Sequence, residues 1–135
     1  MSTIAAVRDA LETALASMTP PLATAFENIG YQPVVGTPYQ AVNLLAAQPN
    51  NLEMGPGYHE QGILQVSLYY PKDGGPKDAQ DRVELIRAKF ARGASFVAGG
   101  VTTTIPLTPE VAPARIDDDR YVIPVKIRFQ ARIAS

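Results

Sequence analysis

The sequence predicts an α+β fold: a mainly antiparallel sheet with two helices packed on one face, plus a β-hairpin. Apolar residues recur every three or four positions around 3–18 and 78–90, a spacing typical of amphipathic helices. The remaining regular segments alternate apolar with polar residues, or are short β-prone runs between Gly and Pro residues. Because 135 residues suit one domain and no linker divides the chain, we expect a single domain over 1–135.

The first predicted helix has one apolar stripe and ends before a proline pair. Ser2 or Thr3 can cap its start. Pro20 and Pro21 end it, because proline lacks the backbone donor that the next turn needs. The expected buried stripe consists of Ile4, Val7, Leu11, Leu15 and Met18.

The second predicted helix follows the turn "PKDGGPKD". Asp78 is expected to cap its N-terminus and Gly93 to terminate it. Its buried stripe should consist of Ala79, Val83, Ile86 and Phe90.

Strands are predicted before and after these helices. Short β-prone runs occupy 23–27 and 39–46, and a longer alternating strand covers 63–70. On that strand Leu64, Val66, Leu68 and Tyr70 share the expected core face. The stretch 48–57 is so rich in Pro, Gly and Asn that we expect a mobile loop.

The last third of the chain reads as a hairpin, an irregular segment and a final strand. Gly99-Gly100 separates two β-prone runs, 108–119 is expected to be irregular, and 120–133 has the cleanest alternation. Pro124 cannot donate a ladder hydrogen bond and therefore predicts an edge or a bulge. The core face of the final strand should carry Tyr121, Ile123, Val125, Ile127, Phe129, Ala131 and Ile133.

Composition excludes several classes of protein. Cysteine is absent, which removes disulfides, thiolate nucleophiles and cysteine-bound metals. Twelve Lys and Arg against thirteen Asp and Glu give a net charge of -1, so no global field attracts nucleic acid or acidic lipid. The charged residues Arg8, Asp9 and Glu12 interrupt the apolar N-terminal segment, which predicts a soluble protein without a signal peptide or membrane partner.

Residues that could support chemistry are few. His59 beside Glu60 suggests acid/base or zinc chemistry, but strand neighbours point to opposite faces and no H-E-x-x-H motif is present. The run Asp117–Asp119 lacks the spacing of a calcium loop and fits a solvated turn. No glycine-rich stretch ends in G-K-[ST], and no serine lies in a G-x-S-x-G elbow. We therefore expect no enzyme, catalytic residue, metal or cofactor.

Two surface features are candidate interfaces. Lys126, Arg128 and Arg132 align on one face of the final strand, where they could contact phosphates or an acidic partner. A charged outer face that prevents aggregation explains the same row. Tyr58, Ile63 and Tyr69 give the neighbouring strand a half-apolar second face, which a neighbouring subunit or a helix of the same chain could cover.

Several stretches, taken together, resemble the phage and prophage tail terminator-like family of long-tailed phages. The likeness includes "ELIRAKFARG" and "RYVIPVKIRFQAR" and runs nearly end to end. An E-N-x-x-[FY]-x-P segment is matched by Glu27, Asn28, Tyr31 and Pro33. An E-x-G-[IL]-x-Q-V-x-[LVF]-[YF]-Y-P-like strand is matched by Glu60, Gly62, Ile63, Gln65, Val66, Leu68, Tyr69, Tyr70 and Pro71.

The resemblance implies a structural protein of the virion tail, assembled in the host cytoplasm. Such proteins form a ring, commonly of six copies, that terminates the tail tube and joins it to the head connector, with DNA passing through the channel. The implied partners are further copies of the chain, the tube protein and the connector protein. The alternative from another class is a nucleic-acid-binding module that uses the basic face of the C-terminal strand.

Overall fold

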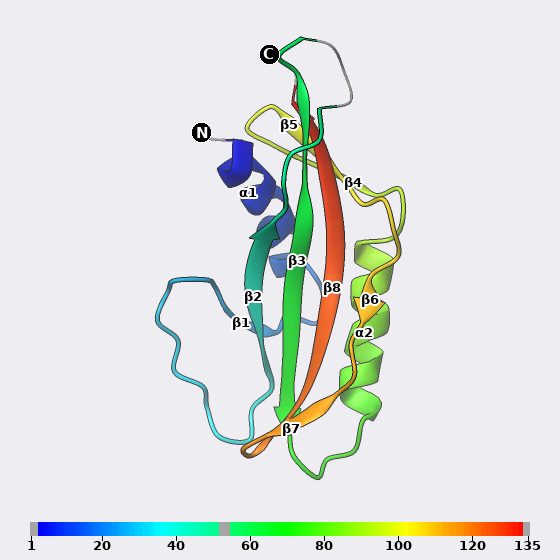
Figure 1. The fold of residues 1–135 in the computed structure, drawn as a ribbon. Helices are drawn as coiled ribbons and strands as arrows, with labels where there is room; N and C mark the ends of the chain where they lie inside the picture. The colour runs from blue at the N-terminus through cyan, green and yellow to red at the C-terminus, as the bar shows by residue number, and fades with distance from the viewer. Residues whose placement is uncertain (1–2, 52–54, 134–135) are drawn as a thin grey trace.

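The computed structural model describes residues 3–51 and 55–133 as one eight-stranded sheet with two helices. The strand order is β1-β2-β3-β8-β5-β4, and β6 and β7 also pair with β8 (Figure 1). In chain order the elements are α1 (Thr3–Ala16), β1 (Ala23–Ala25), β2 (Tyr39–Ala46), β3 (Tyr58–Pro71), α2 (Lys77–Lys89), β4 (Ser95–Ala98), β5 (Val101–Thr104), β6 (Glu110–Val111), β7 (Arg115–Asp117) and β8 (Arg120–Ile133).

Two long strands form the centre of the sheet. β3 and β8 have 14 residues each and pair antiparallel without a break, from Tyr58 opposite Ile133 to Pro71 opposite Arg120. β2 pairs antiparallel with the other edge of β3, and the short β1 is its parallel neighbour. The fold is α+β, as the sequence predicts.

Both helices cover the same face of the sheet and enclose the core there. The apolar stripes predicted for the two helices are confirmed: their residues are buried except Ile4, which is half-buried. The core face of the long strands is likewise confirmed. Its fully buried side chains include Leu64, Val66, Leu68, Val125, Ile127 and Phe129.

The helix ends differ from the sequence prediction. Pro76, not Asp78, is the N-cap of α2, and Asp78 lies in the first turn, where its charge favours the helix dipole. The helix ends at the C-cap Phe90, three residues before Gly93. Gly93 instead has φ 91° in the following turn, and its amide donates to the carbonyl of Ile105. α1 begins at Thr3, and Ser2 lies outside the described residues.

The segment predicted to be irregular between 108 and 119 forms two short strands, so that prediction was wrong. β6 pairs with Val125 and Lys126, and β7 pairs with the stretch 120–122 of β8. Both strands are too short for alternation to reveal them; pairing with β8 is what makes them strands.

Pro124 is neither at a sheet edge nor in a bulge, because it lies inside the unbroken β3–β8 register opposite Ser67. Its carbonyl accepts a hydrogen bond from the amide of Ala112, so its nitrogen also points to the β6 side of the strand. There β6 has already ended and β7 has not begun. The missing donor therefore costs no ladder hydrogen bond with β3.

The loop predicted at 48–57 separates β2 from β3. Asn50 and His59 exchange two backbone hydrogen bonds, with N–O distances of 2.8 and 2.9 Å, which extends the sheet by one bridge. Residues 52–54 lie outside the described part of the chain. The mobility of this loop stays a prediction.

Gly62 allows β2, β3 and β8 to approach each other closely. A Cβ atom at this position would collide with the carbonyl oxygen of Leu45 and lie 2.9 Å from Cζ of Phe129. Phe129 is directly opposite Gly62 in the β3–β8 register, and its ring is fully buried. The ring therefore occupies space that any side chain at position 62 would take.

We predict that Gly62→Ala lowers the free energy of unfolding by about 2 kcal/mol, because overpacking a core costs about 1–3 kcal/mol. Urea denaturation measures this change. Gly30→Ala is the matched control, since a Cβ atom there meets nothing within 4 Å and φ is not positive. Equal stability of the two variants would show that the strands can move apart without cost.

Candidate assembly surfaces

The sheet face opposite the helices carries the candidate interface residues of the final strand. Along β8, Lys126 and Arg128 are half-buried on this face, and Gln130 and Arg132 are exposed. Across the sheet, Lys126 lies opposite Gln65, and Arg128 lies opposite Ile63. The predicted row therefore runs along the middle of this outer face, on a central strand of the sheet.

Glu110 of β6 partly offsets the positive charge of this row. Its Oε1 atom accepts a hydrogen bond from Nη1 of Arg128 at 3.0 Å, and the pair is partly exposed. Glu110 is also opposite Lys126 in the β6–β8 register. The row thus offers less charge to a phosphate backbone than its three cations suggest.

The apolar candidates do not form one patch. Ile63 and Tyr69 are half-buried on the outer face, whereas strand alternation puts Tyr58 on the helix-covered face. Tyr69 lies eleven positions after Tyr58 along the strand, which corresponds to about 36 Å. Only Ile63 lies beside the basic row, opposite Arg128.

Tyr69 instead belongs to an aromatic cluster at the other end of the sheet. Its ring stacks on Tyr39 with a centroid distance of 4.6 Å, and Tyr31 packs on Tyr39 at 5.1 Å. The guanidinium carbon of Arg120 lies 5.1 Å from the Tyr39 ring centroid. Burial, and then the neighbouring Tyr69, raise the pKa of the Tyr39 hydroxyl.

Arg120 also fixes the loop that leads into β2. Its Nη1 and Nη2 atoms donate to the carbonyls of Thr37 and Val34 at 2.5 and 2.7 Å, and the residue is only 7% exposed. The segment 28–38 is named here the β1–β2 loop. Because the charged guanidinium of Arg120 donates to two of its carbonyls, it holds the base of this loop in place.

The β1–β2 loop presents apolar side chains to solvent. Ile29, Val34 and Val35 are 66%, 61% and 85% exposed. None of the eleven residues from 28 to 38 carries a charge. Figure 1 shows the loop projecting from the side of the sheet away from α2 and β6. An exposed apolar loop with a fixed base is a feature of interaction surfaces.

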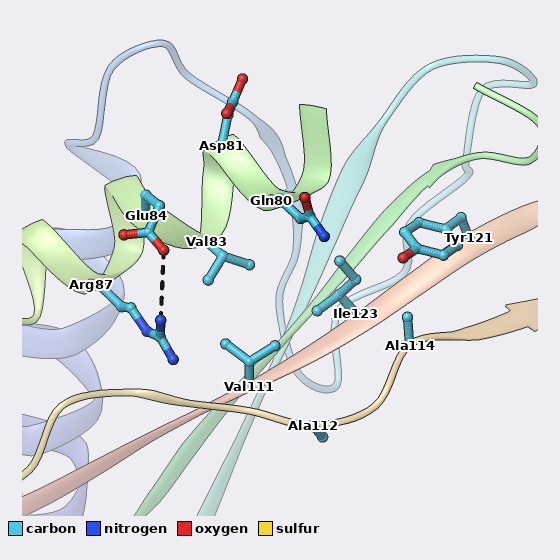
Figure 2. A pocket seen from close by; sticks show the side chains of 10 residues that line it. All are labelled: Gln80, Asp81, Val83, Glu84, Arg87, Val111, Ala112, Ala114, Tyr121 and Ile123. Atoms are coloured by element: carbon cyan, nitrogen blue, oxygen red, sulfur yellow. Dashed lines mark ion pairs between the residues drawn. The ribbon is translucent and has the colours of Figure 1, made fainter. Parts of the chain in front are cut away.

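A groove of about 590 Å³ lies between α2 and β6 on the other side of the molecule (Figure 2). Its floor is apolar: Val83 of α2, Val111 of β6 and Ile123 of β8 converge there. Ala112, Ala114 and Tyr121 extend the lining toward β7. Volumes of 300–1,000 Å³ are typical of binding clefts.

The charged side chains at the rim of this groove are paired within the chain. Arg87 and Glu84 form an ion pair at 3.5 Å, drawn in Figure 2, and Arg87 Nε donates to the carbonyl of Pro109. Asp81 accepts from Lys77 Nζ at 2.7 Å. The groove thus combines an apolar floor with the polar side chain of Gln80 and with a rim whose charges are largely compensated.

The edge of β2 beyond β1 is partly occupied by a side chain. Glu27 Oε1 accepts the backbone amide of Leu44 at 2.9 Å and a hydrogen bond from Arg8 at 3.1 Å. These contacts, the Leu44 amide first, lower the pKa of the Glu27 carboxyl despite some desolvation. One edge donor of β2 is therefore already satisfied.

His59 and Glu60 point to opposite faces of β3, as the sequence predicts, and Glu60 is buried. Asp117 ends β7, and Asp118 and Asp119 join it to β8; Asp118 has φ 58°, and all three side chains are exposed. Within 3–51 and 55–133, no group of three His, Cys, Asp or Glu residues could hold a metal ion. No helix in this part of the chain is long and apolar enough to cross a membrane.

Neither the aromatic cluster nor the groove was predicted from the sequence. Arg120 contacts carbonyls 83 and 86 residues away, and no local pattern reveals such a contact. The groove depends on β6, which the sequence does not predict. For the exposed β1–β2 loop the sequence offered one signal. Pro33-Val34-Val35-Gly36 is an apolar stretch without helical or strand period.

These observations define a small α+β domain whose distinguishing features are surfaces for contact. The chain belongs to the family of phage tail terminator proteins, since the model of that family matches residues 6–129. One solved structure is similar to this chain, with a TM-score of 0.76 and 18% identity, over 98% of this chain and 94% of that chain. That likeness concerns the fold alone. No curated protein matches significantly.

Family membership confirms the resemblance seen in the sequence. It identifies a protein of the phage virion tail that interacts with other tail and head components, and it is consistent with a structural rather than an enzymatic role.

We predict that Arg120→Met lowers the free energy of unfolding by about 2 kcal/mol, since a hydrogen bond to a charged group contributes about 1.5–3 kcal/mol. Amide exchange should accelerate at Thr37, whose amide donates to the carbonyl of Val34 at 3.1 Å, because the base of the loop loses its two donors from Arg120. Arg92→Met, at an exposed position, is the control and should change neither quantity. Unchanged exchange in Arg120→Met would show that the loop is held by other contacts.

Proposed function

We propose that this protein assembles into a ring that ends polymerisation of the tail tube and then joins the tube to the head connector. The observation that carries the proposal is family membership over 6–129, combined with a domain that offers unlike surfaces on opposite sides. Unlike surfaces make heterologous contacts, and a heterologous contact repeated with the right rotation closes into a ring. We expect six copies.

The ring has two axial faces, and termination requires them to differ. One face binds the last ring of tube subunits, and the other offers no site for a further tube subunit. That second face binds the connector, while DNA passes through the central channel. The chain acts through contacts alone, without catalysis or a cofactor, and assembly takes place in the host cytoplasm.

A phage or prophage that lacks this chain should produce tails of excess and variable length without heads, because nothing stops the addition of tube subunits. Electron microscopy measures the tail lengths and the fraction joined to heads. Supplying the wild-type chain in trans should restore a single length. Tails of normal length that only fail to join heads would contradict termination and favour a role in completion of the neck.

We predict that the basic row contributes to an assembly contact or faces the DNA channel. The triple variant Lys126→Glu, Arg128→Glu and Arg132→Glu should still fold, because all three side chains are at least partly exposed and the loss of the partly exposed Arg128–Glu110 pair costs at most about 1 kcal/mol. It should reduce the yield of finished particles, because a repulsion repeated at each interface multiplies. Plaque titre and tail length are the readouts.

The matched control is Lys72→Glu, Lys89→Glu and Arg92→Glu, which makes the same charge change at exposed positions away from the outer face. Wild-type yield in both variants would mean that the basic row is a solvated sheet face. Binding of duplex DNA to the wild-type subunit, with strong salt dependence and loss in the basic-row variant only, would favour the nucleic-acid-binding alternative.

A further inference from the structure

We infer that the β1–β2 loop of one copy docks into the groove between α2 and β6 of the next copy. The inference rests on the proposed ring and names the surfaces that would join its subunits. It uses two features that a single chain leaves unexplained: an apolar loop exposed to solvent and, on the opposite side, a groove with an apolar floor.

The loop has the properties of an insertion element. Val35, its most exposed apolar side chain, is 85% exposed, and the neighbouring Val34 is 61% exposed. The hydrogen bonds from Arg120 to Val34 and Thr37 already order the base of the loop. Docking then costs less conformational entropy than the ordering of a free segment would.

The groove has matching properties. Val83, Val111 and Ile123 offer an apolar floor in a volume of about 590 Å³. At the rim, Arg87 forms an ion pair with Glu84, and Asp81 forms one with Lys77. Because these charges are already paired, the rim does not favour a charged ligand. A loop without any charge from 28 to 38 suits such a rim, because an ion brought there would lose hydration without gaining a partner.

The positions of the two surfaces favour a second copy of this chain as the occupant. The loop precedes β2, which lies on one side of the central strands β3 and β8. β6 lies on the opposite side, next to β8 (Figure 1). Each copy therefore presents a loop to one neighbour and a groove to the other. Such a contact joins two different surfaces rather than one surface to itself. The subunits of a cyclic ring larger than a dimer require contacts of this kind.

The absence of cysteine from the chain permits a direct test by disulfide cross-linking. The double variant V35C/V111C, oxidised in assembled tails, should give a ladder of covalent multimers on a non-reducing gel that ends at the ring number. V35C alone should stay monomeric. V35C/V97C is the matched control, because Val97 is also strongly exposed but lies on β4, away from the groove.

We expect the cross-linked fraction of V35C/V111C to exceed that control by roughly tenfold, because thiols held at one interface have effective concentrations near the mM range. In mixtures of the single variants V35C and V111C, only dimers should form. A second measurement does not depend on disulfide geometry: Val35→Asp should abolish association of subunits, and Val111→Lys in the same chain should restore it.

Other occupants of the groove, or other targets of the loop, have distinct outcomes. A benzophenone maleimide on V35C reacts with whatever lies against the loop in the tail. Peptides from 80–87 or 111–123 of a second copy support the inference, whereas a peptide from the tube or connector protein overturns it. Rings that form without any Val35–Val111 cross-link overturn the loop contact but leave the proposed function intact. Absence of any association between copies in finished tails overturns both.

Discussion

β3 and β8 pair along fourteen residues each, and the other elements are placed relative to this pair. β2 pairs with the free edge of β3, while β5, β6 and β7 share the free edge of β8. Gly62 leaves room for the Phe129 ring at the point where the carbonyl oxygen of Leu45 of β2 also approaches. The position of the groove follows from the same pairing, because Ile123 of β8 forms its floor and β6 exists only as a partner of β8.

The sequence predicted those parts of the fold that depend on periodic burial. The stripes of both helices and the core face of β8 follow from which side chains avoid water, and that pattern is local. The short strands β6 and β7 and the position of Pro124 were not predicted, because tertiary neighbours decide them. Pro124 shows the reason: a missing donor disfavours a central strand only when a partner carbonyl faces the proline nitrogen.

The candidate surfaces were less predictable than the core. Alternation did place Lys126, Arg128 and Arg132 on one outer face, but it could not reveal that Glu110 approaches from another strand. Tyr58 and Tyr69 belong to one strand and yet lie on different faces near opposite ends of it. Arg120 had no local signal at all, since its acceptors are more than eighty residues earlier in the chain. Surfaces built from segments distant in sequence require the pairing of the strands to be known.

The carboxylate of Glu27 on the edge of β2 has a consequence for how copies can associate. A strand edge with free amides is a template on which another chain can add a strand without limit, and this is a common route to insoluble aggregates. The Glu27 carboxylate accepts the hydrogen bond of the Leu44 amide, and Arg8 donates to the same carboxylate and holds it in place. An incoming strand would have to displace an ion pair before its own ladder could form. The β2 edge is therefore less open to unlimited strand addition than an edge whose amides are all free.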